Sequence, residues 1–130
     1  TAHDMGLLTT PYAFNAEEAA AMAKAGCDVL IAHVGLTTKG TIGAKTALSL
    51  ELAAQRVQEM CDAAKRVNPN VLVLCHGGPI AEPADAQYVL DQTLNVVGFY
   101  GASSIERLPV EPAITERVRE FTRLEFPKNT

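Results

Sequence analysis

Two histidines in this sequence each stand at the end of an almost continuously apolar run. His33 lies near the end of residues 28–34, and His76 ends residues 71–76. An imidazole gains and loses a proton near neutral pH, so such a pair can transfer protons, orient a carboxylate or, less readily, bind a metal. The alternative is that each is a structural histidine with satisfied hydrogen bonds. We take His33 and His76 as candidate catalytic residues because both have the same place relative to a predicted strand.

Glycines and hydroxyl-bearing residues follow the predicted strands. Glycine permits close backbone approach, and hydroxyls and backbone amides bind anions, although the same residues also form ordinary tight turns. In barrels of parallel strands, phosphate often binds in the loops after the last two strands. The candidate substrate- or phosphate-binding residues are Thr9, Tyr12, Gly77, Gly78, Gly101, Ser103 and Ser104.

Two further segments carry charge that a site could use. The long segment 35–48 contains Lys39 and Lys45, and we expect it to be a lid that closes over an anionic ligand. The alternative is a solvated loop. Glu106 is a candidate general acid or base, unless it forms an ion pair with Arg107 that fixes its loop.

The apolar periodicity alternates between strand and helix along residues 1–130, which we expect to form a single domain. Strands are predicted near residues 7–10, 28–34, 71–76 and 96–100, and helices near 16–25, 50–67, 83–94 and 112–124. Four such βα units predict an α/β fold with a parallel sheet covered by helices. Right-handed crossovers place all the strand carboxyl ends at one edge, which is where the candidate residues would gather.

Several segments resemble the phosphoenolpyruvate-hydrolase-like TIM-barrel family. They are GLLTTPYAF, AHVGLTTKGTIGAKTALSL, CHGGPIAEPADAQYVL and GASSIERLPVEPAI. This family is related to phosphoenolpyruvate mutase and phosphonopyruvate hydrolase barrels, and includes the C-terminal domain of a plant tobamovirus-resistance protein. Because its members have a complete (β/α)8 barrel, the resemblance implies that this chain is the C-terminal half.

The resemblance also implies a function. The expected activity is that of a hydrolase or lyase acting on a small anionic oxo acid through a metal-stabilised enolate, with this chain supplying the anion-binding half of the site. Mg²⁺ is implied as a cofactor, but no metal ligands are identified in this chain. The alternative function is a non-enzymatic barrel module that binds a small molecule or a protein partner.

Composition limits the partners and the compartment. The 130 residues are 48% hydrophobic and 20% charged with a net charge of −4, which predicts a globular protein without a nucleic-acid or membrane surface. Three scattered cysteines favour a reducing compartment, and we expect a cytoplasmic location. Four strands cannot close a barrel, so we expect a homo-oligomer or pairing with a missing N-terminal half.

Overall fold

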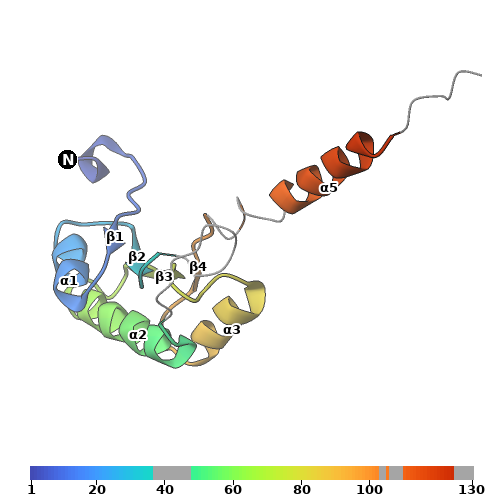
Figure 1. Cartoon of the computed structure of the whole chain (residues 1–130). Helices are drawn as coiled ribbons and strands as arrows, with labels where there is room; N and C mark the ends of the chain where they lie inside the picture. The colour runs from blue at the N-terminus through green and yellow to red at the C-terminus, as the bar shows by residue number, and fades with distance from the viewer. Residues whose placement is uncertain (37–47, 103–104, 106–109, 125–130) are drawn as a thin grey trace, which may run out of the picture.

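The computed structural model describes residues 1–36, 48–102, 105 and 110–124 and contains a four-stranded parallel sheet in the order β1-β2-β3-β4 (Figure 1). The strands are β1 (Tyr12–Ala13), β2 (Val29–His33), β3 (Leu72–His76) and β4 (Gly98–Phe99). The helices are α1 (Ala16–Lys24), α2 (Leu50–Val67), α3 (Pro83–Asp91) and α5 (Val110–Thr122), with a 3-10 turn, η1, at His3–Met5. The predicted α/β class with four parallel strands is confirmed.

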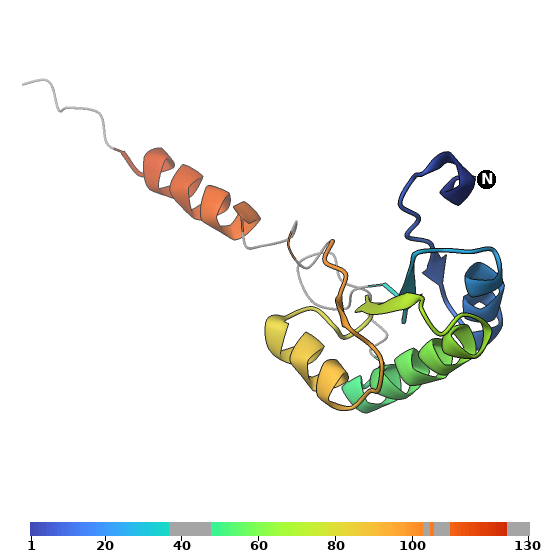
Figure 2. The same cartoon turned by 180° about the vertical axis from the view of Figure 1, so that it is seen from behind.

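Helices α1, α2 and α3 lie against one face of the sheet (Figures 1 and 2). Leu30 and Ala32 of β2 and Val73 and Cys75 of β3 point toward them and belong to the buried core. Side chains alternate along a strand, so Ile31, His33, Leu74 and His76 point to the opposite face. Helices thus cover one face of the sheet, and His33 and His76 lie on the other face at its carboxyl edge, as in a segment of a TIM barrel.

The first strand lies later in the sequence than the predicted 7–10. Val29 N–H bonds to the Thr9 carbonyl at 3.1 Å and Ile31 N–H bonds to the Pro11 carbonyl at 3.0 Å. Proline has no N–H, so Pro11 cannot return a bond to Val29, and the regular ladder begins only at Tyr12. Pro11 is therefore the reason that the strand begins later than residues 7–10.

The remaining boundaries differ by a few residues at the element ends. β4 is shorter than the predicted 96–100, although Val97 N–H and Tyr100 N–H still bond to carbonyls of β3. α3 ends at Asp91 rather than near residue 94, and α5 spans Val110–Thr122 rather than 112–124. Of the helices that the structure describes, none has the length and hydropathy needed to cross a membrane.

Candidate functional site

His33 and His76 lie side by side at the carboxyl ends of β2 and β3. They are register partners in the parallel ladder, and their ring centroids are 4.7 Å apart with an interplanar angle of 79°. Both residues are buried, at 9% and 7% exposure. The prediction that these two imidazoles meet at one sheet edge is therefore confirmed, while their catalytic role stays a prediction.

Hydrogen bonds assign opposite tautomers to the two rings. His76 Nδ1 lies 2.7 Å from the Tyr100 carbonyl oxygen, which can only accept, so Nδ1 carries the proton and Nε2 has a free lone pair. His33 Nδ1 accepts a hydrogen bond from Gly35 N–H at 3.1 Å, so neutral His33 carries its proton on Nε2. One ring thus offers a base and the other a donor at the same edge.

The electrostatic environment of His33 favours its neutral form. Burial lowers the pKa of His33 below its ordinary value of 6.5, and the charge of His76 lowers this pKa further. Neutral His33 keeps Nδ1 available to accept from Gly35 and Nε2–H available to donate. The depressed pKa therefore supports the role assigned by the hydrogen bonds.

This environment predicts a pH-dependent contribution to stability. Below about pH 6.5 the unfolded chain protonates His33 while the folded chain resists it, so the unfolded state binds more protons and stability falls with falling pH. We expect the free energy of unfolding to decrease more steeply between about pH 6.5 and 5.5 in the wild type than in His33→Gln. Urea unfolding at several pH values measures both slopes, and an equal or shallower wild-type slope would contradict the assignment.

Three aromatic side chains surround the imidazole pair. Tyr12 of β1 stacks on His76 with ring centroids 5.4 Å apart and 16° between planes, and meets His33 edge-on at 5.0 Å. Phe14 lies 4.7 Å from His33, and Tyr100 lies 5.7 Å from His76. The sequence predicts Tyr12 at the site, but it does not predict Phe14 or Tyr100 there. The signal for Phe14 is its spacing of two from Tyr12 in extended chain, which puts both rings on one face.

Gly77 and Gly78 bring the chain after β3 close to the end of β2. The Gly78 N–H donates to the Gly35 carbonyl at 2.7 Å. This bond contradicts the expectation that the Gly78 N–H donates a hydrogen bond to a bound anion. Gly77 has a φ of 81°, and a Cβ there would lie 2.3 Å from the Gly35 carbonyl oxygen and 3.1 Å from His33 Cε1. The two glycines are thus required for the close approach that holds His33 and Gly35 in place.

Thr9 lies away from the imidazole pair, contrary to its predicted place at the site. Its hydroxyl donates to Asp28 Oδ2 at 2.7 Å and accepts from Asp28 N–H at 3.0 Å, next to the first residue of β2. The hydrogen bonds that the Thr9 hydroxyl and the Thr9 N–H donate to the Asp28 carboxylate are the main cause of the lowered pKa of Asp28. His3 Nδ1 also lies 3.1 Å from Asp28 Oδ1. Thr9 is therefore part of a polar network at the amino edge of the sheet, because β1 begins later than expected.

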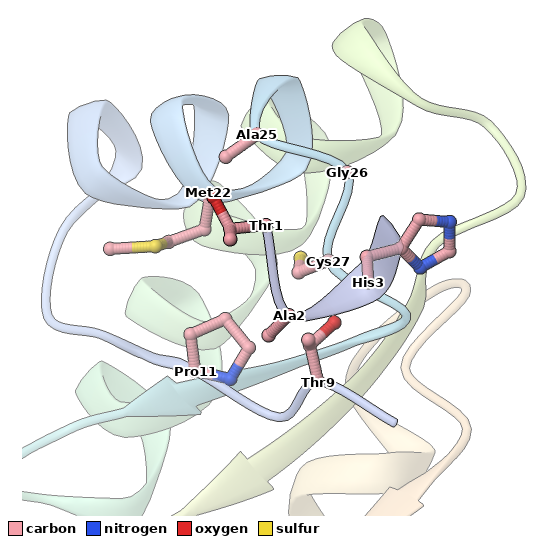
Figure 3. A pocket seen from close by; sticks show the side chains of 9 residues that line it. All are labelled: Thr1, Ala2, His3, Thr9, Pro11, Met22, Ala25, Gly26 and Cys27. Carbon is pink, nitrogen blue, oxygen red and sulfur yellow. The ribbon is translucent and has the colours of Figure 1, made fainter. Parts of the chain in front are cut away.

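A small cavity of about 220 Å³ lies beside this network (Figure 3). It is lined mainly by the N-terminal segment and the end of α1, and the buried Cys27 is one of the lining residues. Burial raises the pKa of the Cys27 thiol, so it stays protonated and unreactive. The same holds for Cys75, which precedes His76: burial raises the pKa of the Cys75 thiol to about 11. These cysteines are buried side chains and supply no nucleophile to the imidazole pair.

The other predicted site residues divide into one that the structure describes and five that it does not. Gly101 follows β4 at the same carboxyl edge, and a Cβ there would lie 2.7 Å from Ile105 Cδ1. Those outside the described residues are Lys39, Lys45, Ser103, Ser104 and Glu106. Their roles as lid, phosphate-binding and catalytic residues stay predictions.

The sequence model of the phosphoenolpyruvate hydrolase-like family matches residues 1–124. The chain belongs to this family. The chain is also 63% identical over 121 residues to the ToMV susceptible protein tm-1(GCR26) and 62% identical over 120 residues to the ToMV resistance protein Tm-1(GCR237), both of Solanum lycopersicum. These matches cover 93% and 92% of this chain, but the chain spans only 16% of the length of either relative.

A solved structure agrees with the fold of this phosphoenolpyruvate hydrolase-like chain. The N-acetylmannosamine-6-phosphate 2-epimerase from Clostridium perfringens superposes with a TM-score of 0.51, covering 92% of this chain and 45% of the epimerase, at 20% identity. At that identity the likeness concerns the fold alone. It agrees with a partial TIM barrel.

The described part of the chain contains no set of ligands for the Mg²⁺ that the family resemblance implies. No cluster of three or more His, Cys, Asp or Glu residues there could hold a metal ion. Asp28, next to β2, is at the amino edge and is already bonded to Thr9 and His3. The described residues therefore do not fit a magnesium centre.

Proposed function

We propose that this chain provides the proton-transfer part of an active site for a small anionic oxo acid of the phosphoenolpyruvate or phosphonopyruvate type. The observation that carries the proposal is the pair of adjacent imidazoles with opposite tautomers, a base at His76 Nε2 and a donor at His33 Nε2. Membership of the phosphoenolpyruvate hydrolase-like family supports this substrate class.

The two roles account for the hydrolysis of phosphonopyruvate. His76 Nε2 takes a proton from the water whose oxygen attacks phosphorus. The C–P bond breaks, its electron pair stays on the substrate as the pyruvate enolate, and phosphate leaves. The His76 imidazolium then returns the proton to C3 and gives pyruvate. Cleavage of the P–O bond of phosphoenolpyruvate produces the same enolate and needs the same proton.

His33 would act on the substrate oxygen rather than on carbon. Its Nε2–H can donate to the oxo oxygen, where negative charge develops as the enolate forms. Because the pKa of His33 is depressed, it would remain a neutral donor while His76 changes protonation state. Tyr12 and Phe14, 41% and 57% exposed, cover the two buried imidazoles from one side and limit their contact with bulk water.

The second candidate function is a binding or regulatory module without catalysis. The names of the relatives favour it: the tomato proteins are named for susceptibility or resistance to ToMV, and a Sinorhizobium fredii protein that is 29% identical over 120 residues is named a putative transcriptional regulatory protein. In that case the imidazole pair would be structural, and the barrel would present a surface to its partner.

Two assays on the full-length protein separate the candidates. With phosphonopyruvate and added Mg²⁺, the proposal predicts equal amounts of phosphate and pyruvate. With pyruvate in deuterium oxide, it predicts loss of the C3 methyl proton signal by NMR as His76 removes and returns protons. No phosphate from phosphonopyruvate or phosphoenolpyruvate, together with no exchange at C3, would overturn the enzymatic proposal in favour of the binding module.

A further inference from the structure

Each imidazole of the pair keeps one buried ring nitrogen without a hydrogen-bond partner among the described residues. Nδ1 of His76 bonds to the Tyr100 carbonyl and Nδ1 of His33 bonds to the Gly35 N–H, whereas no described residue bonds to either Nε2 atom. Both histidines are more than nine-tenths buried. Buried polar atoms in native proteins are nearly always paired, so two adjacent unpaired ones indicate a bound group that supplies the partners.

The two unpaired nitrogens require opposite partners. Nε2–H of His33 needs an acceptor, and Nε2 of His76 needs a donor. An oxyanion that still carries a proton meets both needs, because one of its oxygens is a hydroxyl and the others accept. A fully ionised oxyanion would instead place its own lone pairs against the lone pair of His76 Nε2.

The described rings in contact with the pair do not offset that repulsion with a positive charge. They are the neutral aromatic rings of Tyr12, Phe14 and Tyr100. Burial, followed by the charge of His76, lowers the pKa of His33, so the donor ring resists becoming a cation. The pair is therefore suited to distinguish oxyanions of equal charge by the proton that they carry.

We propose that the imidazole pair binds phosphate that carries a proton and discriminates against oxyanions that carry none. The phosphate hydroxyl donates to His76 Nε2, and a second phosphate oxygen accepts from His33 Nε2–H. The choice of phosphate among such oxyanions rests on the proposed function, in which phosphate is a product.

The proposed hydrolysis leaves phosphate in this protonated form. The attacking water brings two protons, of which one passes through His76 to C3 and the other stays on the oxygen that has joined phosphorus. That oxygen was bonded to His76 Nε2 while it belonged to water. Once His76 is neutral again, the remaining proton can donate to the same nitrogen, so the base of the reaction holds the product.

Phosphate and sulfate test this selection, because at about pH 8 both are mainly doubly charged and they differ by one proton. Calorimetric titration of the full-length protein is expected to give a Kd for phosphate at least about tenfold below that for sulfate, because sulfate leaves His76 Nε2 without a donor. Equal affinities, or no binding of phosphate, would overturn the proposal. Selection of phosphate without hydrolysis of phosphonopyruvate would refute the proposed function alone, and hydrolysis with equal affinities would refute the selection alone.

The variant His76→Phe removes the acceptor and keeps a ring beside Tyr12. Its preference for phosphate over sulfate is expected to fall to about twofold or less, because the remaining His33 donor serves both anions equally. His3→Phe makes the same substitution at the amino edge of the sheet and should keep the wild-type preference. A folded His76→Phe protein with the wild-type preference would contradict the role of His76.

A measurement on the wild type needs no variant to fold. Saturation with phosphate is expected to shift the nitrogen-15 resonance of His76 Nε2, because this nitrogen gains a hydrogen bond, while His76 keeps its proton on Nδ1. Saturation with sulfate should leave the resonance in place. Equal shifts with the two anions, or no shift with phosphate, would overturn the proposed contact.

Discussion

Replacement of His76 by glutamine is expected to lower both phosphate release and C3 proton exchange by about 10²–10⁴-fold, the range for removal of a positioned general base. Glutamine has a side chain that can still donate to the Tyr100 carbonyl, 2.7 Å from His76 Nδ1, but it has no basic nitrogen in place of Nε2. The variant therefore removes the proton acceptor while retaining a hydrogen-bonding group. Steady-state turnover and NMR exchange rates measure the loss.

His3→Gln is the matched control for this variant. His3 lies near Asp28 at the amino edge of the sheet, far from the pair in the fold, and its replacement should leave turnover unchanged. A His76→Gln protein that folds and retains wild-type exchange would show that His76 is not the base. Circular dichroism of each variant checks the fold.

Replacement of Gly77 by alanine is expected to have the largest effect on the geometry of the site. The alanine must adopt the left-handed φ of 81°, and its Cβ would lie 2.3 Å from the Gly35 carbonyl oxygen. The ends of β2 and β3 must therefore move apart. The backbone conformation alone costs about 1–2 kcal/mol, and we expect the clash to add at least about 1 kcal/mol to the loss of unfolding free energy. Turnover should fall as well, because His33 contacts the same position. Urea unfolding and turnover measure the two effects.

Gly26→Ala separates the clash from the backbone strain. Gly26 has a φ of 82°, and a Cβ there meets nothing within 4 Å. It should therefore lose only the conformational part of the stability and none of the activity. Equal losses in Gly26→Ala and Gly77→Ala would contradict the role assigned to the β2–β3 approach.

The sequence predicts the meeting of His33 and His76 because both histidines end buried apolar strands of one parallel sheet. The register then follows from alternation and strand order, which are local and repetitive features. The opposite tautomers of the two rings could not be predicted, because the tautomer of His76 depends on the carbonyl of Tyr100, which is distant from His76 in the sequence. Such a contact is fixed only when β4 pairs with β3.

Thr9 and Gly78 show where local interpretation failed. Thr9 resembles a hydroxyl at the carboxyl end of a strand. Because Pro11 has no N–H to donate to the ladder, β1 begins only at Tyr12, and Thr9 lies at the amino edge of the sheet. Gly78 resembles an anion-binding amide, but its N–H bonds to the Gly35 carbonyl. Both errors arise because the partner of a backbone group depends on tertiary packing.

NMR of the histidine side chains directly tests the assignment of opposite tautomers to the imidazole pair. Long-range proton–nitrogen correlation spectra of the nitrogen-15-labelled chain distinguish protonated from unprotonated ring nitrogens. At about pH 8, above the ordinary histidine pKa of about 6.5, we expect His76 to be protonated on Nδ1 and His33 on Nε2. The same tautomer in both rings, or the reverse assignment, would contradict the account.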